Sequence, residues 1–571
     1  MGSRRGLLRI IAAWAFPALA VLTLALGVSA WLDQGQPFSN ALYKSIALFD
    51  IGNTNYDGTN KVILSDPRIR VGRWTGLTAV FGTAILALMA LLQERVALMM
   101  ARWLRQDVVV VGSDGVAIKA FEAARQAKKS VVWLGAPNLG TSTINSIALP
   151  WPPEDQAKSV LEHAGDAAHV LIAQPDDASA LAVVRSARRA APNAWITVLM
   201  HDVRLAEDAA ETFNEPRTRV LSQAAVAARA LSLEHPPFLM AKERGHTRVH
   251  ALLVGFGRTG QAIARDLIVN GRTTYLDKPR ITVIDPRANA LAAVMRVRAP
   301  EVDQSADLAF VDGEIGSSAI APDMQTLSRA VVDGGPVTAV YVCLRHDSDA
   351  LATAGMLQSF MRMASGEPPM IFVRLRDAGV VSTATEGQRG LDTLTSFGEL
   401  ESILKASEFL SAAPDAAARA FNEAYRASLT PEMLNDPDNR AVRPWDTLEE
   451  TYRQANRDAV AHIPAKLASA GIDPKLWRGV TGIPALSHDI CLFRDAQELE
   501  ALAMLEHERW NAQRRMDGWR WADLPAKDEA RRLHPSLAAY EDLTDPVKEY
   551  DRIYVRETQA RLRATRAAQK A

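Results

Sequence analysis

Three glycines and one aspartate near the middle of the chain have the spacing of a phosphate- and ribose-binding motif. Gly255, Gly257 and Gly260 form a G-x-G-x-x-G pattern directly after the apolar run HALLV, and Asp285 closes the next apolar run, ITVID. In that context the first glycine permits a tight turn, the second lets a phosphate approach the backbone, and the third allows close helix packing. The aspartate can bind ribose hydroxyls. We therefore predict a site for NAD(H) or an adenine nucleotide, with Arg258 as a further contact and a purely structural turn as the alternative.

An earlier segment repeats this order of strand, glycine turn, helix and strand without the same chemistry. Gly112 follows VVVV, but Asp114 and Ala117 stand at the other two glycine positions, and the next run, VVWLG, has no acidic residue. A carboxylate at Asp114 would repel a phosphate. The segment VLIAQPDDASALA also aligns with VYVCLRHDSDALA without a gap. The chain therefore holds two related, doubly wound α/β (Rossmann) domains, the first a scaffold or dimerisation copy or, alternatively, a site for a different ligand.

The composition narrows the classes of function. The 571 residues include 65 Lys and Arg against 66 Asp and Glu, so no net charge favours a nucleic acid partner. The two cysteines, Cys343 and Cys491, lie far apart, which supports neither a disulfide framework nor a clustered metal site. His507-Glu508 has no second histidine at zinc-protease spacing. We expect no metal and no catalytic residues, and hence no enzyme.

The first hundred residues contain two uncharged apolar runs, Ile10 to Leu32 and Trp74 to Leu92. Each is close to the ~20 residues that a membrane-spanning helix needs. Together they predict an α-helical two-span hairpin in the plasma (prokaryotic inner) membrane. Basic residues flank the hairpin and also occupy its loop, so the distribution of positive charge does not set the orientation. We expect both termini in the cytoplasm because the chain after residue 105 has the character of a cytosolic protein. A cleaved signal peptide is the alternative for the first run.

Between the two runs, apolar residues at helical spacing predict a short helix over residues 39–49, followed by a glycine-bearing turn. This order of elements resembles a two-span pore-loop channel of the potassium-channel kind, in which backbone carbonyls of a T-V-G-Y-G filter replace the water of the ion. Ile51 and Gly52 match that filter, whereas Asp50, Asn53 and Thr54 depart from it. The resemblance implies a cation pore with a non-standard filter, in which Asp50 side chains form a carboxylate ring. The alternative is a periplasmic loop between two anchors.

Tandem Rossmann units behind such a pore resemble the regulator-of-potassium-conductance (RCK, TrkA-N) domains of ligand-gated channels, over about residues 105–400. The resemblance implies a cytoplasmic gating ring beneath a homotetrameric pore. Symmetry also follows from physics, because one hairpin cannot enclose a pore.

The C-terminal part resembles another module. The segments LEHERWNAQRRMDGWRW and ARRLHPSLAAYEDLTDPVKEYDR, together with WDTLEETYRQANRDAVAHIPAKLASAG, are similar to the ryanodine-receptor repeat (RyR domain), a small and mainly helical module. The resemblance implies a nucleotide-like ligand. Six residues are candidates to bind it, the aromatic ones by stacking and the arginines by charge, namely Arg457, Trp510, Arg514, Trp519, Trp521 and Tyr540. Core packing is the alternative for most of the aromatic residues.

The predicted domains are a transmembrane pore domain at 1–104, a degenerate Rossmann domain at 105–245, a nucleotide-binding Rossmann domain at 246–411, a helical linker at 412–444 and an RyR domain at 445–571. We expect a ligand-gated cation channel in contact with lipid, a permeating cation and nucleotide-type ligands. The alternative is a membrane-anchored nucleotide sensor or regulatory subunit that does not conduct. A membrane-bound oxidoreductase is a third class, disfavoured because no substrate domain or placed acid and base can be found.

Overall fold

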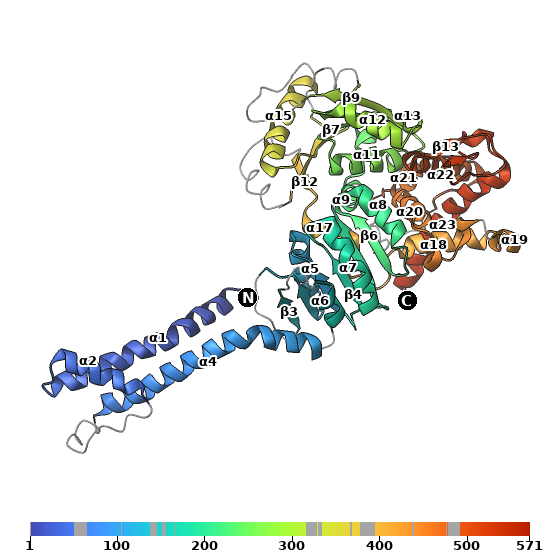
Figure 1. Ribbon diagram of the computed structural model, residues 1–571. Coiled ribbons are helices and arrows are strands. Elements are labelled where there is room, and N and C mark those ends of the chain that lie inside the picture. The colour runs from blue at the N-terminus through green and yellow to red at the C-terminus, as the bar shows by residue number, and fades with distance from the viewer. Residues whose placement is uncertain are drawn as a thin grey trace. The chain divides into compact units, whose positions relative to one another are not determined.

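The computed structural model describes residues 2–50, 66–103, 106–137, 145–150, 156–165, 167–313, 315, 328, 334–365, 368–376, 394–436, 439–474, 477 and 491–570. Within these ranges, the side chains of residues 2–14, 563–570 and several between 86 and 102 are not described. The chain divides into two compact units, Met1–Met100 and Ala101–Ala571, and each is treated by itself below. Figure 1 labels the helices and strands.

The first unit is a pair of long helices with a short helix packed against both. The long helices are α1 (Gly2–Asp33) and α4 (Pro67–Trp103), and between them lie α2 (Phe38–Ile46) and η1 (Ala47–Phe49), where the sequence predicted a helix. A Cβ atom at Gly27 would lie 2.6 Å from the Ser45 hydroxyl oxygen, and one at Gly76 would lie 2.9 Å from the Leu48 carbonyl oxygen. The absence of a side chain at these positions of α1 and α4 therefore lets the short helix approach both.

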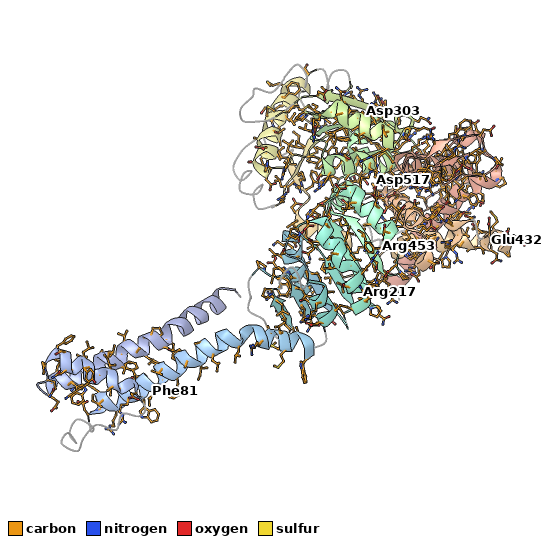
Figure 2. All side chains as sticks on the ribbon, in the orientation of Figure 1. Phe81, Arg217, Asp303, Glu432, Arg453 and Asp517 are labelled. Carbon is orange, nitrogen blue, oxygen red and sulfur yellow. The ribbon has the colours of Figure 1, made fainter. Side chains whose placement is uncertain are left out.

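The apolar character of this unit fits a membrane environment. In the described part of the chain, one helix, Ala15–Asp33, is long and apolar enough to cross a membrane, with a mean hydropathy of 1.9. It overlaps the first predicted span. The second, Trp74 to Leu92, lies in α4, where several side chains are not described, and it stays a prediction. Phe81, labelled in Figure 2, is 51% exposed on α4. A signal sequence near the N-terminus satisfies the same criterion of length and hydropathy, so the hairpin topology stays a prediction as well.

The first Rossmann domain is a six-stranded parallel sheet with strand order β3-β2-β1-β4-β5-β6. Its strands are β1 (Val108–Val111), β2 (Val131–Leu134), β3 (Ser146–Leu149), β4 (His169–Ile172), β5 (Trp195–Met200) and β6 (Thr218–Ser222). The helices of this region are α5 (Gly115–Gln126), α6 (Gln156–His163), α7 (Asp177–Ala190), α8 (Val203–Thr212), α9 (Gln223–Glu234) and α10 (Pro237–Glu243). Runs such as Val108–Val111 are fully buried, which explains why this strand is continuously apolar rather than alternating.

The second Rossmann domain repeats this topology, with the order β9-β8-β7-β10-β11-β12. Its strands are β7 (Arg248–Val254), β8 (Asp277–Asp285), β9 (Asp307–Asp312), β10 (Ala339–Val342), β11 (Met370–Arg374) and β12 (Leu394–Phe397). The helices are α11 (Arg258–Asn270), α12 (Ala288–Arg298), α13 (Val302–Ser305) and α15 (Asp347–Ser365). Strands β4 and β10, whose sequences align, hold the same place beside β1 and β7. The prediction of two related doubly wound domains is therefore confirmed.

The remaining elements are almost all helical. They comprise α17 (Leu400–Ser407), α18 (Ala416–Ala427), α19 (Pro431–Leu434), η4 (Arg440–Val442), η5 (Trp445–Thr447), α20 (Glu450–Ala461), α21 (Ile463–Ser469), α22 (Ala496–Met516), β13 (Arg520–Trp521), β14 (Leu533–His534), η8 (Tyr540–Asp542) and α23 (Asp545–Lys570). Helix α17 follows the last strand of the second domain, yet its Ile403 and Leu404 lie in the core of the first. Phe421 of α18 belongs to the same core as Leu505 of α22 and Val555 of α23.

Candidate functional site

The glycine-rich turn between β7 and α11 needs two of its three glycines for its own shape. Gly255 has a φ of +89°, and a Cβ atom there would lie 3.0 Å from the Cys343 carbonyl oxygen. A Cβ atom at Gly260 would lie 2.3 Å from the carbonyl oxygen of Gly255. These two positions let the chain turn tightly and pack the helix on the turn.

Gly257 is different, because nothing in the described chain requires a glycine there. It is the N-cap residue of α11 with an ordinary φ of −70°, and a Cβ atom on it would meet no atom within 4 Å. No side chain caps the helix at this end. The first N–H groups of a helix have no partner within it, and the helix dipole adds partial positive charge. The space in front of Gly257 is therefore suited to a phosphate.

Asp285 lies beside this turn, as the sequence predicted for a ribose-binding carboxylate. One of its oxygens, Oδ2, accepts a hydrogen bond from the Phe256 backbone N–H at 2.9 Å, and Oδ1 accepts one from Arg287 N–H at the same distance. An ionised carboxylate has about four acceptor positions, so it can accept further hydrogen bonds from hydroxyl groups. Arg258, the first residue of α11, forms a 3.4 Å ion pair with Asp202, the N-cap residue of α8 in the first Rossmann domain. Both side chains are substantially exposed, so this pair is weak.

The first Rossmann domain has the same turn with its anion position already filled. Asp114 is the N-cap residue of α5, the place that Gly257 holds before α11, and its carboxylate accepts a 2.8 Å hydrogen bond from Ala117 N–H. Burial raises the pKa of Asp114, although hydrogen bonds from backbone N–H groups and the nearby His201 oppose the shift. A Cβ atom at Gly112 would lie 1.5 Å from the Ala173 carbonyl oxygen. The turn is thus retained, while the helix end is occupied by a side chain of the protein itself.

The predicted filter lies almost entirely outside the described residues. Ile51, Gly52, Asn53 and Thr54 are not described, and Asp50 is the exposed residue that follows η1. The filter therefore stays a prediction.

Three of the six residues nominated for the RyR ligand lie together. The guanidinium carbon of Arg514 is 5.8 Å from the ring centroid of Trp510 and 5.5 Å from that of Trp519. His534 contacts both rings edge-on, at 5.0 and 5.9 Å. Tyr452, which the sequence did not nominate, completes the group, with its ring centroid 5.5 Å from the Arg514 guanidinium. Tyr452 lies in a different helix, α20, and nothing in the sequence indicates that it contacts Arg514.

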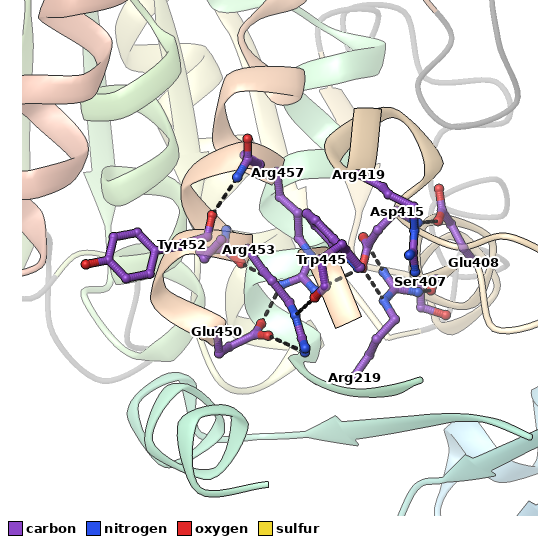
Figure 3. Close-up of polar contacts among 12 residues, drawn as sticks. Arg219, Ser407, Glu408, Asp415, Arg419, Trp445, Glu450, Tyr452, Arg453 and Arg457 are labelled. Carbon is purple, nitrogen blue, oxygen red and sulfur yellow. Dashed lines mark hydrogen bonds and ion pairs between the residues drawn. The ribbon is translucent and has the colours of Figure 1, made fainter. Parts of the chain in front are cut away.

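The other three nominated residues have separate surroundings. Arg457 is 6% exposed and forms ion pairs with Asp415, at 2.9 Å, and with Glu450, as Figure 3 shows. Tyr540 is buried, and its hydroxyl donates to a Glu500 carboxylate oxygen at 2.9 Å. Trp521 is half exposed on β13. The structure does not bring these residues to Arg514, and for Tyr540 it favours the packing role.

Arg457 belongs to a buried charge network that joins the first Rossmann domain to the C-terminal helices. Asp415 pairs with Arg219 of β6 at 3.1 Å as well as with Arg457 of α20 (Figure 3). Burial alone would raise the pKa of Asp415, but the two guanidinium groups outweigh it and hold that pKa well below its usual range. Burial raises the pKa of the neighbouring Glu408 to about 7. Its Oε2 accepts a 3.2 Å hydrogen bond from Asp415 N–H.

A second network starts on α11, the helix that begins at the glycine-rich turn. Arg265 of α11 pairs with Asp458 of α20 at 3.1 Å and with Asp517, just after α22, at 3.5 Å. Asp458 has no exposed surface and also pairs with Arg229 of α9 at 2.8 Å. Burial opposes ionisation of Asp458, yet Arg265 and Arg229 lower its pKa. The N-terminus of α11 thus faces the candidate nucleotide site. Ion pairs of Arg265, in the middle of α11, connect the helix to the C-terminal helices.

Comparisons with known proteins identify one part of the chain. Residues 487–567 match the family model of the RyR domain, so the chain carries an RyR domain in this range. The match contains Trp510, Arg514, Trp519, Trp521 and Tyr540, whereas Arg457 and Tyr452 precede it. No curated protein matches the chain.

Several solved structures share the arrangement only distantly. The structure of GsuK bound to ADP covers 71% of this chain and 97% of its own, with 13% identity and a TM-score of 0.32. GsuK bound to NAD covers 72% and 85%, with 12% identity and a TM-score of 0.35. The dipicolinate synthase structure from Bacillus halodurans covers 53% and 94%, with 10% identity and a TM-score of 0.20. Likenesses at these scores do not assign a function.

Proposed function

We propose that this protein is a nucleotide-regulated membrane protein that acts as a ligand-gated cation channel and catalyses no reaction. Its second Rossmann domain binds an adenine nucleotide or NAD(H) at Gly255, Gly257, Gly260 and Asp285, with Arg258 beside the phosphates. Its RyR domain takes part in sensing, and its N-terminal helices form the membrane part of a homotetramer with both termini in the cytoplasm.

The contrast between the two helix ends carries the nucleotide part of this proposal. Asp114 caps α5 with its own carboxylate, whereas Gly257 leaves the N-terminus of α11 without a side-chain cap and with open space in front of it. A glycine N-cap gives a helix no stabilising side chain. Binding of a phosphate at this end is the physical reason that best accounts for an uncapped helix beside a ribose-type carboxylate.

The pathway from this site to the C-terminal helices is supported by the ion pairs of α11. A phosphate bound at the N-terminus of α11 favours one placement of this helix, and Arg265 transmits any shift to Asp458 and Asp517. Two ligands that favour different placements of these elements are then coupled energetically.

The pore part of the proposal is supported by the packing of the first unit. The short helix α2 and η1 packs against both long helices through Gly27 and Gly76, as a pore helix folded back into the hairpin would. Exposed apolar side chains on α4, such as Phe81, Ile85 and Leu88, suit contact with lipid. A membrane-anchored sensor that does not conduct remains the second candidate, and it is favoured by the departures of Asp50, Asn53 and Thr54 from the potassium filter.

The nucleotide site is tested by giving the second Rossmann domain the cap of the first. We expect purified wild-type protein to bind ADP or NAD, the nucleotides named for the GsuK structures, in isothermal titration calorimetry. Gly257→Asp should abolish the binding event at the glycine-rich turn, because its carboxylate caps α11 as Asp114 caps α5 and repels phosphate. The thermal unfolding midpoint should stay the same or rise slightly, since an aspartate at the N-cap stabilises a helix by only about a few tenths of a kcal/mol more than a glycine.

The matched control is Asp114→Gly, which uncaps α5 and should leave nucleotide affinity unchanged while lowering the unfolding midpoint. Equal nucleotide affinity for the wild type and Gly257→Asp, or no affinity in the wild type, would refute a nucleotide site at α11.

A further inference from the structure

The second unit contains a cavity of about 1610 Å³ whose described walls do not include the glycine-rich turn. The walls come mainly from β6, α8 and α9 of the first Rossmann domain, α11 of the second, α17, α18, α20, the end of α22 and residues that follow α22. Such a volume is ample for a small molecule. Parts of the chain that are far apart in sequence therefore share one candidate binding space.

Arg514 is a buried cation in the wall of this cavity, and it forms no ion pair with a carboxylate among the described residues. Six other arginines of the wall have one, namely Arg204, Arg219, Arg229, Arg265, Arg440 and Arg457. Arg532 of the wall also forms no ion pair within the described chain, but it donates a hydrogen bond to the Asp517 carbonyl oxygen. The Arg514 side chain is 7% exposed, and its Nε is buried without a hydrogen-bond acceptor. Burial of an unpaired charge is costly, and a guanidinium group has five N–H donors to satisfy.

Aromatic rings hold this guanidinium in place without using its donors. Tyr452, Trp510 and Trp519 lie 5.5, 5.8 and 5.5 Å from the guanidinium carbon. Cation–π contacts offset part of the cost of burial but form no hydrogen bonds. Tyr452 and Trp519 also line the cavity, so a planar ring can reach an aromatic face at the same place where an anion can reach Arg514.

Two carboxylates of the cavity wall, Glu529 and Asp517, pair with other cations. Glu529 accepts a 2.8 Å hydrogen bond from the Tyr452 hydroxyl and pairs with Lys527 at 2.8 Å. Asp517 pairs with Arg265 at 3.5 Å. Neither forms an ion pair with Arg514 within the described chain, although the Arg514 charge helps to lower the pKa of Asp517 against the effect of burial. The N–H donors of the guanidinium are therefore still able to bind an anion supplied from outside.

We propose that Arg514, Tyr452 and Trp519 form a second ligand site, for a small molecule that carries an anionic group on a planar ring. The anionic group binds to the guanidinium group, and the ring lies against Trp519 or Tyr452. The site belongs to the cavity shared by the RyR domain and the Rossmann domains rather than to the RyR domain alone. It is separate from the nucleotide site at Gly257 and does not depend on it.

The test uses the full-length Gly257→Asp protein, in which the glycine-rich turn is closed by a carboxylate, and measures AMP binding by isothermal titration calorimetry. AMP supplies a planar ring and a phosphate, adenosine the ring alone, and inorganic phosphate the anion alone. We expect AMP to bind at least ten times more tightly than adenosine, and phosphate to compete with it. Arg514→Gln should weaken AMP binding at least tenfold, and Trp519→Leu should weaken it as well.

Arg514→Lys separates the site from a folding defect, because lysine keeps the charge and the aromatic contacts but lacks the fork of donors. It should fold normally and bind AMP with intermediate affinity. Arg296→Gln, which removes an exposed arginine paired with Asp303, is the control and should leave AMP affinity unchanged. The proposal is overturned if the Gly257→Asp protein does not bind AMP, if adenosine binds as tightly as AMP, or if folded Arg514→Gln and Arg514→Lys proteins bind AMP like their parent.

Discussion

At the scale of single residues, Gly257 and Asp114 show how one side chain separates two otherwise similar turns. Both are N-cap residues that follow a buried strand and a glycine with positive φ. Asp114 supplies the acceptor that the helix end needs, whereas Gly257 leaves that requirement to a ligand. The first domain can therefore keep the fold and have no site for a phosphate at this turn.

The three glycines of the turn should respond differently to alanine. Gly255→Ala and Gly260→Ala should lower the unfolding midpoint, since one forces a side chain into a left-handed conformation and the other places Cβ 2.3 Å from a carbonyl oxygen. The strain at Gly255 corresponds to about 1–3 kcal/mol. Gly257→Ala should lower the midpoint less than either, because its Cβ meets no atom of the protein and alanine is only a poorer N-cap residue than glycine. It should weaken ADP binding, because its Cβ meets the ligand. Differential scanning calorimetry and titration check this. A Gly257→Ala midpoint as low as that of Gly260→Ala would contradict the assignment.

Glu408 should make stability depend on pH near neutrality. Burial raises its pKa from 4.5 to about 7, so between these values the folded protein retains a proton that the unfolded chain has lost. Its contribution is thus fully favourable below pH 4.5 and is lost as the pH rises through 7. Glu408→Gln keeps an acceptor for Asp415 N–H and cannot ionise. From pH 5 to 8, the unfolding midpoint of the wild type should fall more than that of Glu408→Gln, and parallel pH profiles would show that Glu408 is not the cause.

At the scale of elements, α11 connects the proposed nucleotide site with the helices around the RyR domain. Its N-terminus meets the glycine-rich turn, and Arg265 in its middle pairs with the fully buried Asp458. A helix is stiff over this length, so a shift at one end reaches the other contacts. The sequence identified the turn but not this connection, because Arg265 and Asp458 are far apart in the chain and neither belongs to a motif.

Removal of the Asp458 carboxylate should therefore be costly. Asp458→Ala leaves Arg229 and Arg265 without their shared partner, and breaking a buried ion pair in this way costs about 3–5 kcal/mol. The exposed pair between Arg296 and Asp303 provides the control, because Asp303→Ala should cost less than about 1 kcal/mol. Urea unfolding of both variants measures the difference. Similar losses in the two variants would indicate that Asp458 does not hold the elements together.

The Rossmann sheets were predictable from sequence because their strands are short and buried on both faces, which makes them continuously apolar, and because each is followed by a helical pattern. The place of Asp285 beside the turn followed from the same topology. The group around Arg514 was only partly predictable. Trp510 and Trp519 lie close to Arg514 along the chain, whereas Tyr452 comes from another helix and reaches it through packing. The engagement of Arg457 by Asp415 and Glu450 likewise depends on tertiary contacts.

At the scale of the whole molecule, the proposal requires several chains, because a single two-helix hairpin cannot surround a pore. Detergent-purified protein should be a tetramer by size-exclusion chromatography with multi-angle light scattering. Gly257→Asp should form the same tetramer, since Gly257 contributes to the ligand site and not to the fold. A monomer would exclude the pore and leave the membrane-anchored sensor.

The proposed filter also belongs to this scale, because its residues act as a ring. If Asp50 carboxylates surround the axis, they attract cations and repel anions. Asp50→Asn should therefore lower cation conductance in planar bilayers while leaving ADP binding unchanged. A parent protein that prefers chloride, or an Asp50→Asn variant that conducts like the parent, would contradict this arrangement.

Under the proposed function, nucleotide binding at Gly257 controls the passage of cations, and this control can be measured as cation flux from liposomes. Wild-type protein and Gly257→Asp are reconstituted at equal density, and potassium flux is measured with and without ADP or NAD. Nucleotide should change the wild-type flux at least severalfold and should change the flux through Gly257→Asp much less. Flux that responds equally in both proteins, or no flux from the wild type under any condition, would contradict it.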